Sequence, residues 1–96
     1  MEALQKLETH AEEFRKLGAK RIGVFGSASR GEENEVSDLD VYLEFEEGMR
    51  TFRNFIGIHE LLEQLFQRSI DLVTDRALSE RKAKIILPTV RYASLC

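Results

Sequence analysis

The sequence predicts a single domain over residues 1–96, an α/β (α+β) fold in which a small mixed β-sheet carries its helices mainly on one face. Segments with the apolar spacing of amphipathic helices alternate with short β-branched and aromatic segments. A helical segment of about 16 residues separates the second and third predicted strands, as a right-handed crossover between parallel strands requires. The chain is long enough for one thin hydrophobic core.

The first helix and the first strand are predicted before residue 28. Residues 2–17 have an amphipathic pattern in which apolar side chains recur at spacings of three and four. These side chains are Leu4, Leu7, Ala11 and Phe14. Gly18 is expected to end the helix, because glycine readily adopts positive φ. Residues 21–25, RIGVF, predict a short strand that ends at Gly26 and Ser27.

The clearest strand is predicted at residues 38–46, after a helical turn at 28–31 and a polar loop at 32–37. Its sequence, DLDVYLEFE, alternates strictly between polar and apolar side chains. The apolar face comprises Leu39, Val41, Leu43 and Phe45, and the polar face comprises Asp38, Asp40, Tyr42, Glu44 and Glu46. Such alternation indicates a strand with one face against the core.

Three further elements are predicted after Gly48. Residues 51–67 predict a helix with a buried set formed by Phe52, Phe55, Ile56, Leu62, Leu65 and Phe66. Residues 69–74 predict a third strand, in which Ile70 and Leu72 face one way and Asp71 faces the other. A last helix begins near Ser79, a candidate N-cap, and Pro88 either breaks it or lies in the first turn of a following helix. The eight residues that follow are left unassigned.

Three carboxylates are predicted to converge on one face of the sheet. Asp38 and Asp40 share a face of the second strand, and Asp71 lies near the start of its parallel neighbour. Adjacent carboxylates repel one another unless a cation or a proton lies between them. The alternative, exposed carboxylates without a function, fits less well because Asp is disfavoured in strands. Oxygen ligands favour Mg²⁺ or Mn²⁺ over Zn²⁺, and an EF-hand is rejected because Leu43 stands where its loop requires glycine.

The turn after the first strand offers a place for phosphate. Gly26 and Ser27 can present backbone N–H groups and a hydroxyl to phosphate oxygens. Arg30 is either a phosphate clamp or a surface arginine. The basic side chains of the last helix fit a solvated face better than a triphosphate contact; these are Arg81, Lys82 and Lys84. The chain contains no Walker A motif, which excludes a P-loop NTPase.

The composition argues against several classes of protein. No apolar run is long enough for a transmembrane helix, and one cysteine, Cys96, fits a reducing and hence cytoplasmic location. The net charge of −3 combines an acidic first half with a basic second half, but no dense Lys/Arg stripe favours duplex nucleic acid. His10 and His59 are expected to be structural or surface residues. Tyr42 either stacks on a ligand or packs.

Four short motifs give the chain a resemblance to a known family. Gly26-Ser27 stands ten residues ahead of Asp38-Leu39-Asp40, and the pattern is completed by Arg30-Gly31-Glu32 and Ile70-Asp71-Leu72. Over about residues 18–75 the chain resembles a minimal nucleotidyltransferase of the DNA polymerase β-like superfamily. It is similar to the small single-domain members that accompany HEPN-family proteins in toxin–antitoxin pairs.

The resemblance implies that a nucleoside triphosphate, ATP, donates AMP to a hydroxyl in a reaction that uses two Mg²⁺ ions. Gly26 and Ser27 would hold the β- and γ-phosphates. Asp38 and Asp40 would bridge the metal ions, while Asp71 would complete the catalytic metal site and help to deprotonate the hydroxyl.

The resemblance further implies that the acceptor is a tyrosine of a HEPN toxin, so that the chain acts as an antitoxin. Two alternatives remain open: an antitoxin that neutralises its toxin by binding alone, and transfer to a small molecule. The nucleotide preference is open as well, and so is assembly into homo-oligomers or hetero-oligomers.

Overall fold

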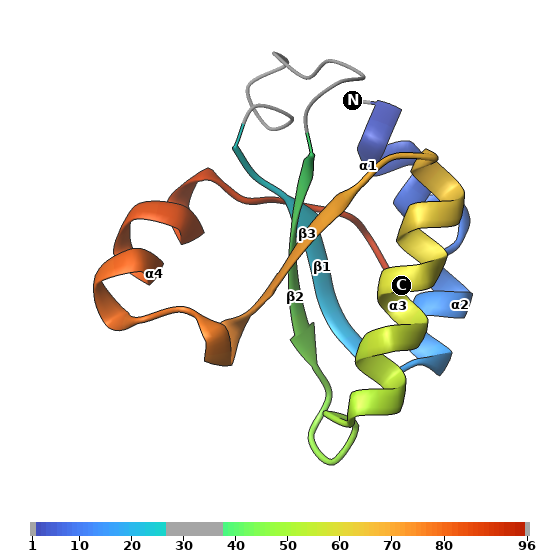
Figure 1. Ribbon diagram of the computed structural model, residues 1–96, viewed down its shortest axis with the longest axis horizontal. Helices are drawn as coiled ribbons and strands as arrows, with labels where there is room; N and C mark the ends of the chain where they lie inside the picture. Colours follow the sequence, from blue (N-terminus) through green and yellow to red (C-terminus); the bar gives the residue numbers. More distant parts are fainter. Residues whose placement is uncertain (1, 27–37, 96) are drawn as a thin grey trace.

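A mixed β-sheet organises the molecule. The structure is a computed structural model that describes residues 2–26 and 38–95 (Figure 1). Within these residues, four strands lie in the order β3-β2-β1-β4. The strands are β1 (Ala19–Val24), β2 (Leu39–Phe45), β3 (Ile70–Thr74) and β4 (Arg91–Tyr92). β2 is parallel to β3, whereas β1 is antiparallel to both β2 and β4. The predicted mixed sheet and the predicted parallel pair are confirmed.

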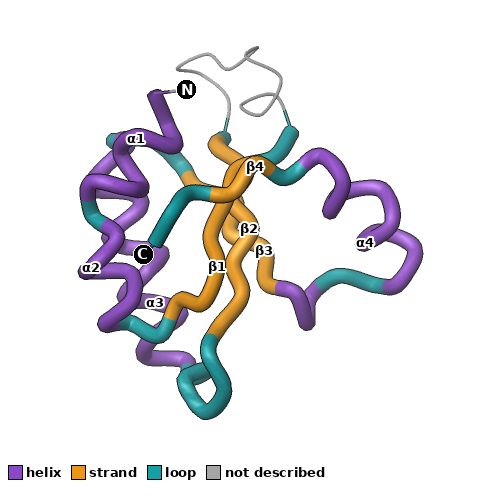
Figure 2. Tube along the Cα trace, turned by 180° about the vertical axis from the view of Figure 1, so that it is seen from behind, coloured by secondary structure: helices purple, strands orange, loops and turns teal. Residues whose placement is uncertain are grey.

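The helices lie mainly on one face of this sheet, as predicted. They are α1 (Glu2–Thr9), α2 (Ala11–Lys16), α3 (Phe52–Phe66) and α4 (Glu80–Ile86), with two 3₁₀ turns, η1 (Asp75–Ala77) and η2 (Leu87–Thr89). The first three helices lie on one side of the sheet and α4 lies on the other (Figure 1, Figure 2). Ser79 caps α4, because its hydroxyl accepts the Lys82 N–H at 3.2 Å. None of the described helices is both long and apolar enough to cross a membrane.

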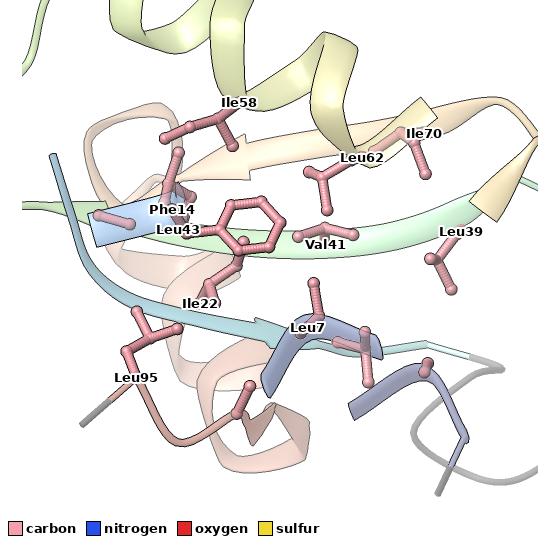
Figure 3. Close-up of a cluster of buried hydrophobic side chains, with 14 of the residues drawn as sticks. Leu7, Phe14, Ile22, Leu39, Val41, Leu43, Ile58, Leu62, Ile70 and Leu95 are labelled. Atoms are coloured by element: carbon pink, nitrogen blue, oxygen red, sulfur yellow. The ribbon is translucent and has the colours of Figure 1, made fainter. Parts of the chain in front are cut away.

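The hydrophobic core lies between the sheet and the three helices on its first face. Alternate side chains of β2 form the centre of the core, and side chains of the helices cover them (Figure 3). The members that are at most 1% exposed include Leu7, Phe14, Leu39, Val41, Leu43, Ile58 and Leu62. Burying each such side chain contributes about 1.5–3 kcal/mol. Because this face of β2 is apolar, the alternating polar side chains lie on the face that α4 borders.

The N-terminal helix differs from its prediction, because residues 2–17 form two helices. α1 ends at Thr9, and His10 departs from helical dihedral angles with φ −107° and ψ 22°. The His10 ring lies 2.9 Å from a Glu13 carboxylate oxygen, a contact that stabilises the turn into α2. Gly18 follows α2 with φ +91°, the conformation expected of a helix stop.

The exposed side of α3 also differs from its prediction. Phe52 and Ile56, expected to be buried, are 81% and 36% exposed. Ile58 and Leu62 are fully buried and define the side of α3 that faces the sheet. At 100° per residue, Phe52 and Ile56 lie on another side of the helix. The apolar residues of α3 in the sequence therefore cover more of the helix surface than the side that packs against the sheet.

The C-terminal residues that were left unassigned complete the sheet and the core. Pro88 lies in the first turn of η2, which is one of its two predicted places. β4 then pairs with β1, and Ala93 and Leu95 join the core with 8% exposure each. β1 begins two residues earlier than predicted. The turn predicted at 28–31 and the loop predicted at 32–37 lie outside the described residues.

Candidate active site

A row of three side chains crosses the sheet on the face that α4 borders. The Phe25 N–H donates to the Asp40 carbonyl at 3.1 Å, and Asp40 is in register with Asp71. Residues opposite one another on neighbouring strands direct their side chains to the same face. Phe25, just past β1, therefore stands beside Asp40 of β2, which stands beside Asp71 of β3.

The carboxyl groups of Asp40 and Asp71 lie side by side on neighbouring strands and interact with each other. A hydrogen bond between them forms when one of them carries a proton, since an ionised carboxylate only accepts. Burial raises the pKa of Asp40 above its ordinary value, and the charge of Asp71 and their hydrogen bond raise it further. Asp38, which is exposed just before β2, also raises the pKa of Asp40 through its charge. The two carboxylates therefore repel each other, and a proton or a cation between them lowers this repulsion.

The donor chemistry of these carboxylates fits a divalent cation such as Mg²⁺ or Mn²⁺. Their ligand atoms are hard oxygens, and the raised pKa of Asp40 means that positive charge between Asp40 and Asp71 is favourable. Among residues 2–26 and 38–95, however, no three Asp, Glu, His or Cys side chains form a group that could hold a metal ion. Of the three predicted carboxylates, the structure places Asp40 and Asp71 side by side, while Asp38 acts on Asp40 through its charge.

Gly26 lies directly against the Asp40 carboxylate. Its φ of +68° favours glycine, and a Cβ at this position would collide with Asp40 Oδ2. Glycine is therefore required here both for the backbone conformation and for the space that Asp40 occupies. The other two residues predicted to hold the nucleotide, Ser27 and Arg30, lie outside the described residues.

Arg68 is a candidate site residue that the sequence analysis did not identify. It is half-buried in the connection between α3 and β3. Its charge lowers the pKa of Asp40, against the larger effects that raise it. The signal available in the sequence was a basic residue shortly before the strand that carries Asp71. Arg68 thus places a positive charge near the acidic pair, and this charge also attracts an anionic ligand.

Tyr42, whose role the sequence left open, is a packing residue. It is 2% exposed, its hydroxyl donates to Glu44 Oε2 at 2.8 Å, and its ring meets Tyr92 edge-on with 6.2 Å between centroids. The Arg21 guanidinium lies 3.9 Å from the centroid of the Tyr92 ring and 3.8 Å from Glu44 Oε2. Burial and the Glu44 hydrogen bond raise the pKa of Tyr42, which keeps its hydroxyl protonated. These contacts fix the sheet next to Asp40.

Both histidines make structural contacts, in line with the prediction. His59 Nε2 lies 3.2 Å from the Ile70 carbonyl oxygen, and its Nδ1 lies 3.4 Å from Glu63 Oε1. Ile70 immediately precedes Asp71 in β3. His59 therefore connects α3 to the strand that carries one of the two paired carboxyl groups.

Comparison with known proteins identifies the family of the chain. Residues 7–92 match the family described as "Nucleotidyltransferase domain". A relative in Thermococcus cleftensis, protein adenylyltransferase MntA, is 41% identical over 87 residues, which cover 90% of this chain and 87% of that protein. A relative in Methanocaldococcus jannaschii, provisionally named a protein adenylyltransferase, is 36% identical over 64 residues, which cover 66% of this chain and 64% of that protein.

A solved structure provisionally described as a minimal nucleotidyltransferase has the same fold. It superposes with a TM-score of 0.76 at 36% sequence identity, over 92% of this chain and 93% of that one. The sheet order and the parallel pair β2–β3 thus belong to a fold that a related chain shares. The chain belongs to the nucleotidyltransferase-domain family and is a nucleotidyltransferase.

Proposed function

We propose that the chain is a Mg²⁺-dependent adenylyltransferase that moves AMP from ATP to a hydroxyl group of a partner protein. The observation that carries this proposal is the pair of carboxyl groups on adjacent parallel strands. Asp40 and Asp71 are in register, Asp71 acts on the pKa of Asp40, and Gly26 leaves room beside Asp40. Nucleotidyl transfer needs such acidic groups, because cations held there stabilise the attacking and leaving oxygens of the phosphoryl group.

The proposed roles of the side chains come from the resemblance to nucleotidyltransferases, and the positions of Gly26, Asp40 and Asp71 support them. Asp38, Asp40 and Asp71 would hold two Mg²⁺ ions, for which Mn²⁺ can substitute. Gly26, with Ser27 and Arg30, would bind the phosphates of ATP. In the transfer, the acceptor oxygen forms a bond to the α-phosphorus and the bond to pyrophosphate breaks. The acceptor proton passes to the carboxylate of Asp71.

The identity of donor and acceptor rests on the relatives and on the sequence motifs. Relatives named protein adenylyltransferases support ATP as donor and a protein as acceptor. The motifs that resemble the nucleotidyltransferases of toxin–antitoxin pairs support a tyrosine of a HEPN-family toxin as the target. The chain would then act as an antitoxin by silencing that toxin through a covalent modification.

Mass spectrometry of a HEPN-family protein co-expressed with the chain tests this function. The wild-type chain should add AMP to a tyrosine of that protein, and an Asp71→Asn variant should not. Glu46→Gln is a suitable control, because Glu46 is exposed just past the end of β2. A wild-type chain that leaves the mass of its partner unchanged would contradict the proposed transfer.

The same variants distinguish the enzyme from an antitoxin that acts by binding alone. If transfer silences the toxin, cells that express the toxin with Asp40→Asn or Asp71→Asn should stop growing. If both variants protect cells as well as the wild type, binding is sufficient and the proposal of catalytic neutralisation is wrong.

A further inference from the structure

A cleft of about 440 Å³ lies between α4 and the face of the sheet that carries the acidic pair. From the sheet side it is lined by Phe25, Asp71 and Val73, and from the side of α4 by Leu78, Lys82 and Ile86, among others. Its volume is within the range of ligand sites in proteins. Since Asp71 is part of the lining, a molecule bound in this cleft touches the acidic pair.

Most of the described residues that line the cleft are apolar. Among residues 2–26 and 38–95, only Asp71 and Lys82 give the lining a polar side chain. The apolar surface is open to solvent, since the lining residue Ile85 is 66% exposed on α4, and Leu87, just after the helix, is 36% exposed. An apolar surface that extends out of a cleft is typical of a site for another protein.

α4 itself forms the wall of this cleft by standing away from the sheet. It projects from the side opposite α1, α2 and α3 and is connected to β3 and β4 through η1 and η2 (Figure 1, Figure 2). Ser79 caps its start, so its direction is fixed locally. Unlike the other helices, α4 contributes no fully buried side chain. Its apolar side chains are available to a partner.

We propose that this α4 cleft is the acceptor subsite, and that it takes an aromatic, hydroxyl-bearing side chain of the target protein. The proposal rests on the proposed function and locates its second substrate. In an in-line displacement the attacking oxygen approaches opposite the leaving pyrophosphate. With the phosphates at Gly26, the attacking hydroxyl belongs on the side of Asp71, where the cleft begins.

The chemistry of the lining selects the aromatic side chain. A phenol ring fills an apolar cleft and carries its hydroxyl at the far end, where Asp71 can accept the proton. The hydroxyl of Ser or Thr lies close to its backbone, so it would draw polar amide groups of the target into the apolar cleft at a cost. A nucleoside base has a polar edge, and none of the lining residues that the structure describes has an amide or hydroxyl side chain to pair with it.

Methyl NMR with small probes tests where the acceptor binds. In protein labelled at isoleucine methyl groups, N-acetyltyrosinamide should shift the signals of Ile85 and Ile86. The methyl of Ile56, exposed on α3 across the sheet, should not move and serves as the internal control. Adenosine should leave all three unchanged. Shifts of Ile85 and Ile86 caused by adenosine would make the cleft a nucleoside site, and shifts from neither probe would also overturn the proposal.

A kinetic comparison separates this inference from the proposed function. Ile85→Ser should lower kcat/KM for AMP transfer to N-acetyltyrosinamide by about tenfold, which corresponds to the loss of one apolar contact. Its Kd for ATP should stay within about twofold of the wild type. Ile56→Ser is the same substitution on the exposed side of α3 and should change neither quantity.

The outcomes of the kinetic comparison are distinct. Equal transfer by Ile85→Ser and the wild type would overturn the acceptor subsite alone. A weaker Kd for ATP in parallel with the slower transfer would assign the cleft to the nucleotide and would likewise overturn it. A wild-type chain that binds no ATP would contradict the proposed function instead.

Discussion

Gly26 and Asp40 share one small space, and this contact decides how the acidic pair is held. Asp40 Oδ2 occupies the volume that a side chain at residue 26 would fill. On the neighbouring strand, Asp71 is in register with Asp40 and raises its pKa. The carboxyl group of Asp40 thus lies between the backbone of Gly26, which has no side chain to fill that space, and the carboxyl group of Asp71. Small changes at either neighbour should alter both stability and ligand binding.

Gly26→Ala tests the contact with Asp40. We expect this variant to lose about 1–2 kcal/mol of unfolding free energy from positive φ, and more from the displaced carboxylate. Gly48→Ala is the matched control, because Gly48 has φ +80° but a Cβ there meets nothing within 4 Å. Urea unfolding measures both. Equal losses in the two variants would show that residue 26 does not press on Asp40.

Asp40→Asn tests the electrostatic state of the acidic pair. Because the pKa of Asp40 is raised above 3.8 in the folded chain, the folded state binds the proton more tightly than the unfolded state. The stability that this gives is complete below about pH 3.8 and is lost as the pH rises through the raised pKa. At neutral pH and without metal, Asp40→Asn should therefore be more stable than the wild type, by up to about 1 kcal/mol.

Thermal unfolding with and without Mg²⁺ measures this effect. Mg²⁺ should raise the Tm of the wild type and of the control Glu46→Gln, since it binds only the folded state. It should leave the Tm of Asp40→Asn unchanged. A metal-free Asp40→Asn variant that is less stable than the wild type at neutral pH would show that the carboxylate is not under repulsion.

The sequence predicted the residues of the acidic pair better than it predicted their surroundings. Strict alternation in residues 38–46 placed Asp40 on the polar face of its strand, which is correct. The effect of Arg68 on Asp40 depends on the path of a connection, which has no periodicity to read. Phe52 has the residue type of a buried position but lies outside the packed stripe of α3. Residue type alone therefore does not give burial.

At the level of elements, α3 connects the two strands that carry the site. Its N-terminus is fixed by Thr51, whose hydroxyl accepts the Asn54 N–H at 3.1 Å. From the middle of the helix, His59 reaches the carbonyl oxygen of Ile70. The length of this helix predicted the parallel pairing of β2 and β3, because such a connection suits few other geometries. The two-residue strand β4 leaves no comparable pattern, since its pairing with the distant strand β1 stabilises it. The break at His10 depends on a local contact with Glu13, which interrupts an apolar spacing that is otherwise continuous.

His59→Ala tests the connection between α3 and β3. Losing the contact with the Ile70 carbonyl should cost about 1–2 kcal/mol of unfolding free energy, because a part-buried acceptor is left without its partner. His10→Ala is the matched control, since its contact with Glu13 is exposed and should contribute less than about 1 kcal/mol. Chemical unfolding measures both variants. A larger loss for His10→Ala would contradict this assignment of roles.

At the level of the whole molecule, the C-terminal segment closes the core. The Ala93 N–H donates to the Ile22 carbonyl at 2.9 Å, and the Ser94 N–H donates to Glu8 Oε2 at 2.8 Å. These bonds tie residues near the end of the chain to β1 and α1. The segment thus belongs to the fold itself, although its sequence gave no periodic signal.

Leu95→Ala tests the contribution of this segment. Leu95 is 8% exposed in the core, so the variant should lose about 2–3 kcal/mol of unfolding free energy. Leu87→Ala is the control, because Leu87 is 36% exposed and its loss should stay below about 1 kcal/mol. Calorimetric unfolding compares the two. Similar losses would show that the C-terminal segment does not seal the core.

The parallel register of Asp40 with Asp71 has a consequence for how the chain folds. The two residues meet only after α3 has closed the connection between their strands, so the acidic pair is a non-local contact. Contacts of this kind form after the entropy of loop closure has been overcome, and they slow folding. The repulsion between the two acids arises at that same late step. Fragments that end before β3 lack the pair, so the acidic pair appears only after β3 has joined β2.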